Sequence, residues 1–380
     1  MTIVFVYDTL AIWGGIERVF TEKMNYFARV FGYDVYMLTT NQGDHPIPFS
    51  LDGRVHYEDL HIQSHLQYRY SFLIRYRMHF SKNRLLKRRL KEKIESIRPD
   101  IIVSTTSRYI PELLQLKGDS LLIAESHSGF EHLMEYDTMN WIRRLELKKL
   151  RNALAKTDVL VALTEQDAKH WRRIHPHVEV IPNVVHLNQT GRYSSLEERR
   201  VIFVGRFCRQ KSIPDLLAVW RIVHQRHPDW RLDMYGDGEY LEMLQNEIKS
   251  MDANITVHEP TSDIMEKYCE SSMLVLTSLY EPFGLVMVEA MSCGLPVVSF
   301  ESDGAEQILM DGDNGFIVKD RNIEAFADRV CRLIEDQPLR QQMGKNGILS
   351  SRRFSAEQVM PRWKDLFETI VRERSSNKKD

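Results

Sequence analysis

The sequence predicts an α/β protein built from two doubly wound, Rossmann-like domains. Two series of short apolar runs alternate with helical patterns, which is typical of parallel sheets covered by helices. A polar, turn-rich stretch at 187–195 separates the two series, and we interpret it as a linker. The length of 380 residues also favours two domains over one.

Each predicted element follows from this alternation. The apolar runs of the first series are expected to form strands at 3–7, 34–38, 101–104, 121–125, 159–162 and 178–181. Those of the second series are expected to form strands at 201–204, 231–234, 255–257, 273–277 and 296–300. The last pattern predicts a helix over 357–372, because Trp363, Leu366 and Phe367 fall on one side of it. Since ligands bind at the carboxyl ends of such strands, the residues that follow strands are the first candidates for a site.

Composition and charge exclude several classes of protein. Hydrophobic residues make up 43% and charged residues 27% of the chain, as in an ordinary globular enzyme. A net charge of -2 provides no field that would attract nucleic acid. The four cysteines are scattered without C-x-x-C pairing, which suits reduced thiols. No run approaches the roughly eighteen apolar residues of a membrane-spanning helix, and no signal peptide is visible, so we expect a cytoplasmic protein.

The most informative stretch is 281–294, in which seven residues separate Glu281 from Glu289. Pro282 is typical of a helix's first turn and Gly294 of the position after its end, so the stretch predicts a helix. Almost every residue between them is apolar, so this helix should be buried, and Glu289 would need a partner there. On one helix the two acids would lie about 12 Å apart on nearly the same side. Acids beside a helix N-terminus can hold hydroxyls and a phosphate, which a sugar nucleotide carries.

This stretch resembles the E-x7-E signature of retaining glycosyltransferases of family 4 (GT4), whose fold is GT-B. The resemblance implies two Rossmann-like domains that face each other across a cleft. Residues 1–186 would form the acceptor-side domain and 199–355 the nucleotide-sugar domain, with a C-terminal helix at 356–374 crossing back to the first. The implied reaction is hexosyl transfer from a nucleotide sugar, expected to be a UDP-sugar, to a hydroxyl with retained anomeric configuration. Similar enzymes build surface polysaccharides, so a glycan or lipid-linked acceptor is expected.

A second motif follows the predicted strand at 201–204. Arg206 and Lys211 stand where cations could neutralise a diphosphate at a strand's carboxyl end. The spacing matches the family motif G-R-x-x-x-x-K-G, in which these residues grip the nucleotide diphosphate. Ser212 replaces the last glycine of that motif, and a left-handed backbone at this position would be strained.

Two further motifs lie in the first series. Gly14 and Gly15 precede a helix, where adjacent glycines let the backbone approach an anionic ligand. They resemble the glycine loop that GT4 enzymes place against the donor diphosphate. His127 follows the strand at 121–125 and matches the GT4 histidine beside the reacting sugar. A structural histidine is the alternative, and Glu125 could merely cap the turn.

The resemblance assigns these residues to two roles. Catalytic roles fall to Glu281, His127, Arg206 and Lys211. Donor binding falls to Gly14, Gly15, Arg206, Lys211, Phe283, Gly284, Leu285 and Glu289. Within the donor set, Glu281 would meet the sugar, the amides of 283–285 the sugar and phosphate, and Glu289 the ribose hydroxyls.

No metal or other cofactor is expected. Asp311 and Asp313 form an Asp-x-Asp pair, but their turn-forming neighbours explain it. No cluster of His, Cys or carboxylates has metal-ligand spacing. Two alternatives stay open: a GT-B epimerase or phosphorylase acting on sugar nucleotides, and a nucleotide-sugar-binding protein without catalysis.

The stretch 68–98 carries eleven cations and two acids, with aromatic and aliphatic residues between them. Such a helix is typical of a membrane-surface element, where each cation near anionic lipid contributes about 1 kcal/mol. A solvated helical face explains it equally well, and nothing supports nucleic-acid binding. On the membrane interpretation the protein is peripheral on the cytoplasmic membrane face. The expected contacts are Arg84, Lys87, Arg88, Arg89 and Lys91.

Overall fold

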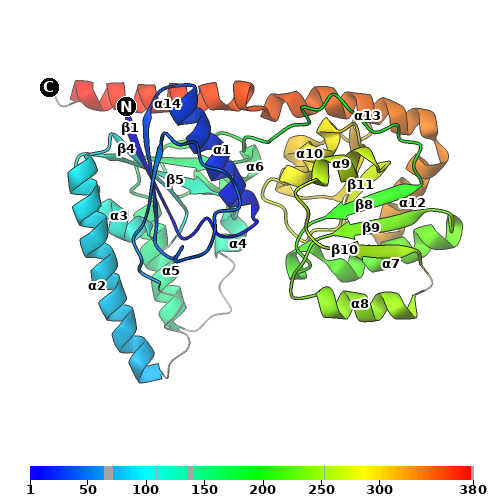
Figure 1. Cartoon of the computed structure of the whole chain (residues 1–380), viewed down its shortest axis with the longest axis horizontal. Coiled ribbons are helices and arrows are strands. Elements are labelled where there is room, and N and C mark those ends of the chain that lie inside the picture. The colour runs from blue at the N-terminus through cyan, green and yellow to red at the C-terminus, as the bar shows by residue number, and fades with distance from the viewer. Residues whose placement is uncertain (64–71, 108, 135–140, 252, 378–380) are drawn as a thin grey trace. The chain divides into compact units, whose positions relative to one another are not determined.

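The structure is a computed structural model, and it describes residues 1–63, 72–107, 109–134, 141–251 and 253–377. The chain divides into two compact units (Figure 1). Unit 1 comprises Met1–Val184 together with Val359–Asp380, and unit 2 comprises Val185–Gln358. Each unit is a doubly wound α/β domain around one parallel sheet, as the sequence predicted.

Unit 1 has a seven-stranded sheet in the order β3-β2-β1-β4-β5-β6-β7, and every neighbouring pair is parallel. Its strands are β1 (Thr2–Tyr7), β2 (Asp34–Thr39), β3 (Val55–Asp59), β4 (Ile101–Thr105), β5 (Leu121–Ser126), β6 (Val159–Ala162) and β7 (Val178–Val180). Its helices are α1 (Gly15–Arg29), α2 (Phe72–Ile97), α3 (Ile110–Leu116), α4 (Phe130–Met134), α5 (Trp141–Leu154), α6 (Glu165–Trp171) and most of α14 (Ala356–Asn377).

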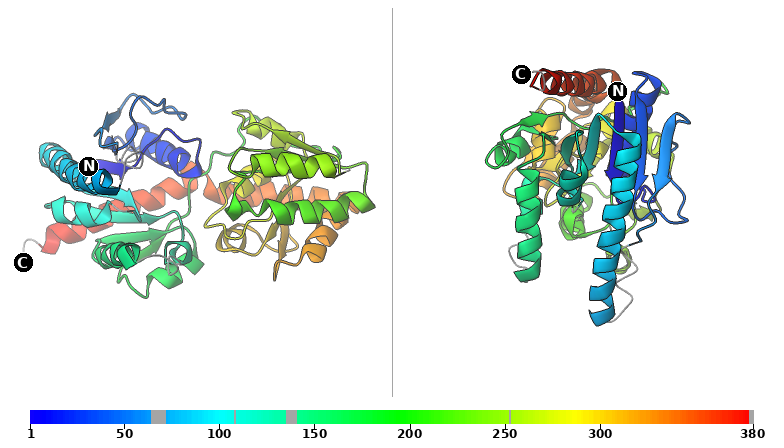
Figure 2. Two further views of the ribbon diagram at one scale, coloured as in Figure 1. Left: turned by 90° about the horizontal axis from the view of Figure 1, so that it is seen from below. Right: turned by 90° about the vertical axis from the view of Figure 1, so that its left-hand side faces the viewer.

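The two faces of this sheet carry different helices. On one face, α2, α3, α5 and α6 pack on a buried apolar cluster that includes Leu90, Leu113, Leu154 and Trp171. On the other face, α1 and α14 pack together, and their rings Phe27 and Phe367 stack with centroids 5.2 Å apart. The C-terminal helix thus belongs to unit 1. Helices α2 and α5 extend past the sheet in the same direction (Figures 1 and 2).

Unit 2 has a six-stranded parallel sheet in the order β10-β9-β8-β11-β12-β13. Its strands are β8 (Arg200–Val204), β9 (Arg231–Tyr235), β10 (Ile255–His258), β11 (Met273–Leu276), β12 (Val297–Phe300) and β13 (Gly315–Val318). Its helices are α7 (Ile213–Arg226), α8 (Leu241–Ser250), α9 (Ile264–Cys269), α10 (Leu285–Ser292), α11 (Asp303–Ile308), α12 (Ile323–Glu335) and α13 (Gln337–Ser351), with short 3-10 turns η3 (Arg209–Lys211) and η4 (Arg352–Phe354). The chain order reverses between β8 and β11, which is where such sheets bind ligands.

The stretch interpreted as a linker differs from that expectation, because it packs on unit 2. The N–H of Asn188 donates to Ser292 Oγ at 3.0 Å, and the N–H of Ser194 donates to the Cys293 carbonyl at 2.9 Å. These hydrogen bonds fasten 187–195 to the end of α10. The polar composition therefore reflects capping of a buried helix rather than a free connection.

Candidate functional site

Glu281 lies before α10, not on it. Gly284 caps the N-terminus of α10 with φ 91°, a left-handed backbone that stops the helix there. A Cβ at Gly284 would also stand 2.2 Å from the Met287 Cε and 3.1 Å from the Glu281 Cγ. The prediction of one helix carrying both acids on the same side was therefore wrong. The predicted end was correct, because Gly294 follows the last turn with φ 88°.

Helix α10 is buried, as its apolar sequence predicted, and Glu289 is buried with it. The residue is only 4% exposed. Tyr268, on α9, is fully buried and donates its hydroxyl to Glu289 Oε2 at 3.4 Å. This hydrogen bond gives the carboxylate a polar partner among apolar side chains, which lowers the free-energy cost of burying it.

The structure joins two of the predicted catalytic residues directly. Lys211 Nζ forms an ion pair with Glu281 Oε2, and both side chains are about nine-tenths buried. Ser278 Oγ donates to the same oxygen at 3.3 Å. Lys211 follows β8 and Glu281 follows β11, so the pair lies at the carboxyl edge where the strand order reverses.

Hydrogen bonds hold the two loops that carry this pair against each other. Thr277 Oγ1 donates to the Lys211 carbonyl at 3.0 Å, and the Leu279 N–H donates to the Gln210 carbonyl at 2.7 Å. The Gln210 side chain donates to the Tyr280 carbonyl at 3.1 Å. The positions of the cation and the acid are therefore fixed by backbone as well as by their own attraction.

Arg321 is a further member of this site that sequence reasoning missed. Its guanidinium pairs with Asp215 on α7 and donates to the carbonyls of Ser278 (2.8 Å) and Thr277 (3.0 Å). It thus ties α7, which begins beside Lys211, to the loop that leads to Glu281. Arg321 follows β13, which the sequence analysis also missed, so its place at the carboxyl edge could not be inferred.

Ser212 adopts the left-handed backbone that the motif's usual glycine would favour, with φ 45° and ψ 60°. A non-glycine residue pays roughly 1–2 kcal/mol for this conformation. The Ser212 hydroxyl donates to Asp215 Oδ2 at 2.9 Å, and Asp215 is itself held by Arg321. This hydrogen bond offsets part of the strain that the sequence predicted.

The other donor-binding candidates of unit 2 have varied surroundings. Arg206 is exposed just after β8. The Phe283 side chain is buried against Phe354, with ring centroids 5.4 Å apart, so only its amide is a candidate for ligand contact. The Gly304 N–H donates to the Glu281 carbonyl at 2.8 Å. The first turn of α11, which contains Gly304, thus helps to place Glu281.

The glycine loop of unit 1 lies against a carboxylate. Helix α1 begins at Gly15, and a Cβ on Gly14 would stand 2.2 Å from Glu17 Oε2. Glu17 is buried and accepts a hydrogen bond from the Tyr7 hydroxyl at 3.1 Å. Burial and the charge of Glu17 raise the pKa of Tyr7 far above its ordinary value. Contact of Gly14 and Gly15 with a donor diphosphate stays a prediction.

His127 is buried at the carboxyl end of β5, with its side chain 2% exposed. Its Nε2 lies 3.0 Å from Glu125 Oε2, and its ring packs edge-on against Phe20. Glu125 does not cap a turn, because its other oxygen pairs with Lys23 on α1. The position of His127 directly after β5 agrees with the expected strand end, and its role beside the reacting sugar stays a prediction.

Each acid of the pair after α11 accepts a hydrogen bond from the protein itself. Asp311 Oδ1 accepts from the Ile317 N–H at 2.9 Å, and Asp313 Oδ1 accepts from the Asn346 amide at 2.9 Å. Among the residues that the structure describes, no group of three or more His, Cys, Asp or Glu side chains is placed to hold a metal ion.

The basic stretch splits into an inner and an outer face on α2. Leu86, Leu90 and Ile94 recur every fourth residue and pack into the apolar cluster of unit 1. Of the five expected membrane contacts, Arg84, Arg88 and Lys91 are exposed, whereas Lys87 and Arg89 are half-buried. Lys87 reaches Gln115, and Arg89 donates to the Leu60 carbonyl. Residues 68–71 lie outside the described part of the chain.

No helix in the described ranges is long and apolar enough to cross a lipid bilayer.

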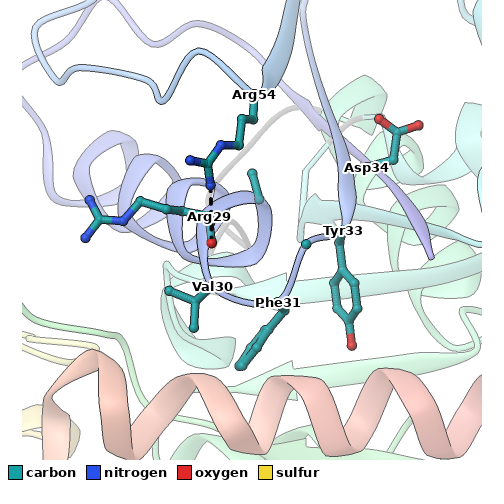
Figure 3. A pocket seen from close by; sticks show the side chains of 8 residues that line it. Arg29, Val30, Phe31, Tyr33, Asp34 and Arg54 are labelled. Carbon is teal, nitrogen blue, oxygen red and sulfur yellow. Dashed lines mark hydrogen bonds between the residues drawn. The ribbon is translucent and has the colours of Figure 1, made fainter.

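A shallow hollow of about 550 Å³ lies at the amino ends of β2 and β3, lined by residues that include Arg29, Tyr33 and Arg54 (Figure 3). The Arg54 guanidinium donates to the Arg29 carbonyl at 3.3 Å. This hollow lies at the opposite edge of the sheet from His127, so it is separate from the candidate site.

Comparison with known proteins matches both units. A family model described as glycosyl transferases group 1 matches residues 192–350, and one described as glycosyltransferase family 4 matches residues 13–189. An uncharacterized glycosyltransferase of Haemophilus influenzae is 28% identical over 363 residues, 93% of this chain and 96% of that protein. The amylovoran biosynthesis glycosyltransferase AmsD of Erwinia amylovora is 28% identical over 218 residues, 54% of this chain and 61% of that protein.

A solved structure shares the fold. It is a mutant of Staphylococcus aureus TarM in complex with fondaparinux, alpha-GlcNAc-glycerol and UDP. The TM-score is 0.78 at 15% sequence identity, over 96% of this chain and 99% of that chain. At this low sequence identity, the structural similarity supports a shared fold and nothing more.

The strain at Ser212 leads to a testable prediction. Ser212→Ala keeps the left-handed cost and loses the hydrogen bond to Asp215, so it should lower the free energy of unfolding by about 1–2 kcal/mol. Ser212→Gly also loses that bond but relieves the strain, so it should be about 1 kcal/mol more stable than Ser212→Ala. Urea unfolding of the two variants measures the difference, and equal stabilities would show that the backbone is unstrained.

Proposed function

Because the chain is a glycosyltransferase of the group 1 and family 4 type with a GT-B fold, we propose that it transfers a sugar from a UDP-sugar to a hydroxyl with retained anomeric configuration. The observation that carries the proposal is the Lys211–Glu281 pair at the reversal point of the unit 2 sheet, with Glu289 eight residues further on. A cation for the leaving group and a carboxylate for the sugar meet there.

The donor would occupy the carboxyl edge of unit 2. Arg206 and Lys211 would neutralise the diphosphate, whose charge grows as the sugar leaves. Glu281 would contact the sugar, and the amides of 283–285 would face the sugar and phosphate. Glu289 would accept hydrogen bonds from the ribose hydroxyls. The cations would supply the stabilisation that a metal ion gives in other enzymes, so we propose a reaction that needs no metal.

Binding of a diphosphate would change the partner of Lys211. In the structure this ammonium group is held by Glu281. A diphosphate oxygen would compete for the same cation, and the carboxylate would then be free to accept hydroxyls of the sugar. The pair therefore keeps both charges satisfied before the donor arrives.

The acceptor is proposed from the relatives rather than from the site. The AmsD relative is an amylovoran biosynthesis glycosyltransferase, and the TarM mutant structure contains UDP and a GlcNAc-bearing glycerol. We therefore propose a glycan or lipid-linked hydroxyl acceptor in polysaccharide assembly. The carboxylate beside the Gly14 loop of unit 1 suits such a hydroxyl-bearing molecule.

A donor screen tests this function. The protein is incubated with UDP-, GDP- and ADP-linked sugars, and its thermal unfolding is measured with each. The donor is identified by the stabilisation it gives, because a ligand that binds the native state raises the midpoint temperature of unfolding. Release of free UDP is then measured with and without simple glycosides. Acceptor-dependent release supports a transferase. Binding without release would indicate a non-catalytic binder, and conversion of the sugar nucleotide without an acceptor would indicate an epimerase.

The two acids should respond differently to substitution. Glu289→Gln should lower the affinity for free UDP by roughly tenfold to a hundredfold, because a charge-assisted hydrogen bond to the ribose is lost. Glu281→Gln should leave UDP affinity equal or higher, because the diphosphate no longer competes with a carboxylate for Lys211, while sugar transfer falls. Titration calorimetry with UDP compares the two as matched isosteric changes. Equal losses in both variants would contradict the assignment of separate roles.

We also propose that α2 meets an anionic membrane. Its exposed cations Arg84, Arg88 and Lys91 have an apolar neighbour, Phe80, which is 59% exposed. Helix α5 projects in the same direction (Figure 2), and its Leu145 is 56% exposed. Cations flanking exposed apolar side chains are what an interfacial helix presents to lipid.

Flotation with liposomes checks the membrane contact. The protein should float with phosphatidylglycerol vesicles, not with neutral ones, and high salt should release it, because screening weakens the attraction. Replacing Arg84, Arg88 and Lys91 with Glu should abolish flotation. The matched control replaces the exposed cations Arg221, Lys249 and Lys345 of unit 2 and should still float. If the two triple variants float to the same extent, the cations of α2 do not bind the membrane and α2 is a solvated helix.

A further inference from the structure

Lys23, Glu125 and His127 form a continuous chain of polar side chains inside unit 1. Lys23 Nζ donates to Glu125 Oε1 at 2.6 Å, and His127 Nε2 lies 3.0 Å from Glu125 Oε2. All three side chains are at most 2% exposed. Each oxygen of the Glu125 carboxylate thus has one of the two partners.

Three elements build this chain of contacts. Glu125 lies near the end of β5, and His127 follows two residues later, so both fall on the sheet face that α1 covers. Lys23 comes from α1. Trp363 of α14 covers the lysine, with its ring centroid 3.7 Å from Nζ, a distance at which cation and ring attract each other. Figure 1 shows α1 and α14 over the same sheet.

The pair is a poor device for stability alone. Taking two charges out of water costs free energy that their attraction repays only in part, and apolar residues often replace such pairs without loss. The surroundings of Lys23 are aromatic, with Phe5 and Phe20 rings within 6.0 Å. An apolar residue would fit this environment, so the charges call for another explanation.

The Glu125 carboxylate favours one position for the proton on the His127 ring. Burial raises the pKa of Glu125, but the charge of Lys23 and the hydrogen bond from His127 outweigh it, so that pKa lies below its ordinary value. An ionised carboxylate only accepts hydrogen bonds, so the 3.0 Å contact with Nε2 is a hydrogen bond when that nitrogen carries the proton. In the neutral ring the lone pair is then on Nδ1.

We propose that Glu125 and Lys23 are positioning residues for His127, which hold its ring with the proton on Nε2 and leave Nδ1 to accept a hydrogen bond from a sugar hydroxyl. Lys23 acts on Glu125 by keeping the carboxylate charged and in place. Glu125 acts on the ring. The inference rests on the proposed function, because it needs a bound sugar beside His127, but its effect on the tautomer exists without substrate.

An apolar replacement of the pair tests this role. Lys23→Met with Glu125→Leu should fold with a melting temperature close to that of the wild type. Its kcat should fall by about a hundredfold, as expected for a misplaced reacting group, with less change in the donor KM. His127→Ala should lower kcat to a similar level. Adding the apolar pair to His127→Ala should have no further effect, because the pair acts through the histidine.

Ser126→Ala is the matched control. Ser126 is the neighbour of Glu125 on β5, on the opposite face of the sheet, where its hydroxyl donates to Asp167 at 2.8 Å. This change removes a buried polar contact and should leave kcat unchanged. If the apolar pair does not fold, Glu125→Gln keeps the size of the side chain, removes its charge, and should lower kcat in the same way.

Nitrogen-15 NMR of the histidine rings supplies a readout without substrate. His127, identified by its absence in His127→Gln, should show Nε2 protonated in the wild type and lose this preference in Glu125→Gln. A proton on Nδ1 in the wild type would overturn the inference. So would wild-type kcat in a folded apolar-pair variant. If the wild type transfers no sugar at all, the proposed function fails, and the NMR result alone decides the role of Glu125.

Discussion

A lysine paired with a glutamate and shielded from water lies at the carboxyl edge of each parallel sheet. In unit 1 the pair is Lys23 with Glu125, and in unit 2 it is Lys211 with Glu281. Neither charge can be buried without its partner, since an isolated charge in such a place costs several kcal/mol. The need to keep each charge beside its partner accounts for features of the surrounding structure. In unit 2 these include the two loops that hydrogen-bond to each other and the start of α7 beside Lys211.

In unit 2 this requirement is met through unusual backbone. Gly284 turns the chain so that Glu281 can lie beside Lys211 instead of on α10. Ser212 accepts a left-handed conformation one residue after the lysine, and Arg321 joins its neighbour Asp215 to the loop of Glu281. The proposed donor site would thus be assembled before a donor binds. Preorganised charges of this kind stabilise a leaving diphosphate without reorganisation during the reaction.

The sequence predicted the parts of this structure that depend on local pattern. Eleven apolar runs correspond to strands, and the motifs placed Lys211 and Glu281 each after a predicted strand; the structure shows that these strands, β8 and β11, are neighbours. It missed β3, whose residues 56–58 are polar and exposed at a sheet edge, and it also missed β13, an apolar strand of four residues. The helix start was wrong because Pro282 precedes a glycine turn. Arg321 escaped detection because its partner Asp215 is 106 residues away, and no spacing rule links them.

The most direct test of the account follows one reaction by proton NMR, with the UDP-sugar selected by the donor screen, a soluble glycoside acceptor and EDTA. Each UDP released should be matched by one new glycoside whose anomeric configuration is that of the donor. The chelator should leave the rate unchanged, because we propose that Arg206 and Lys211 act in place of a metal. A product of inverted configuration, or a reaction that EDTA stops and added metal restores, would contradict it.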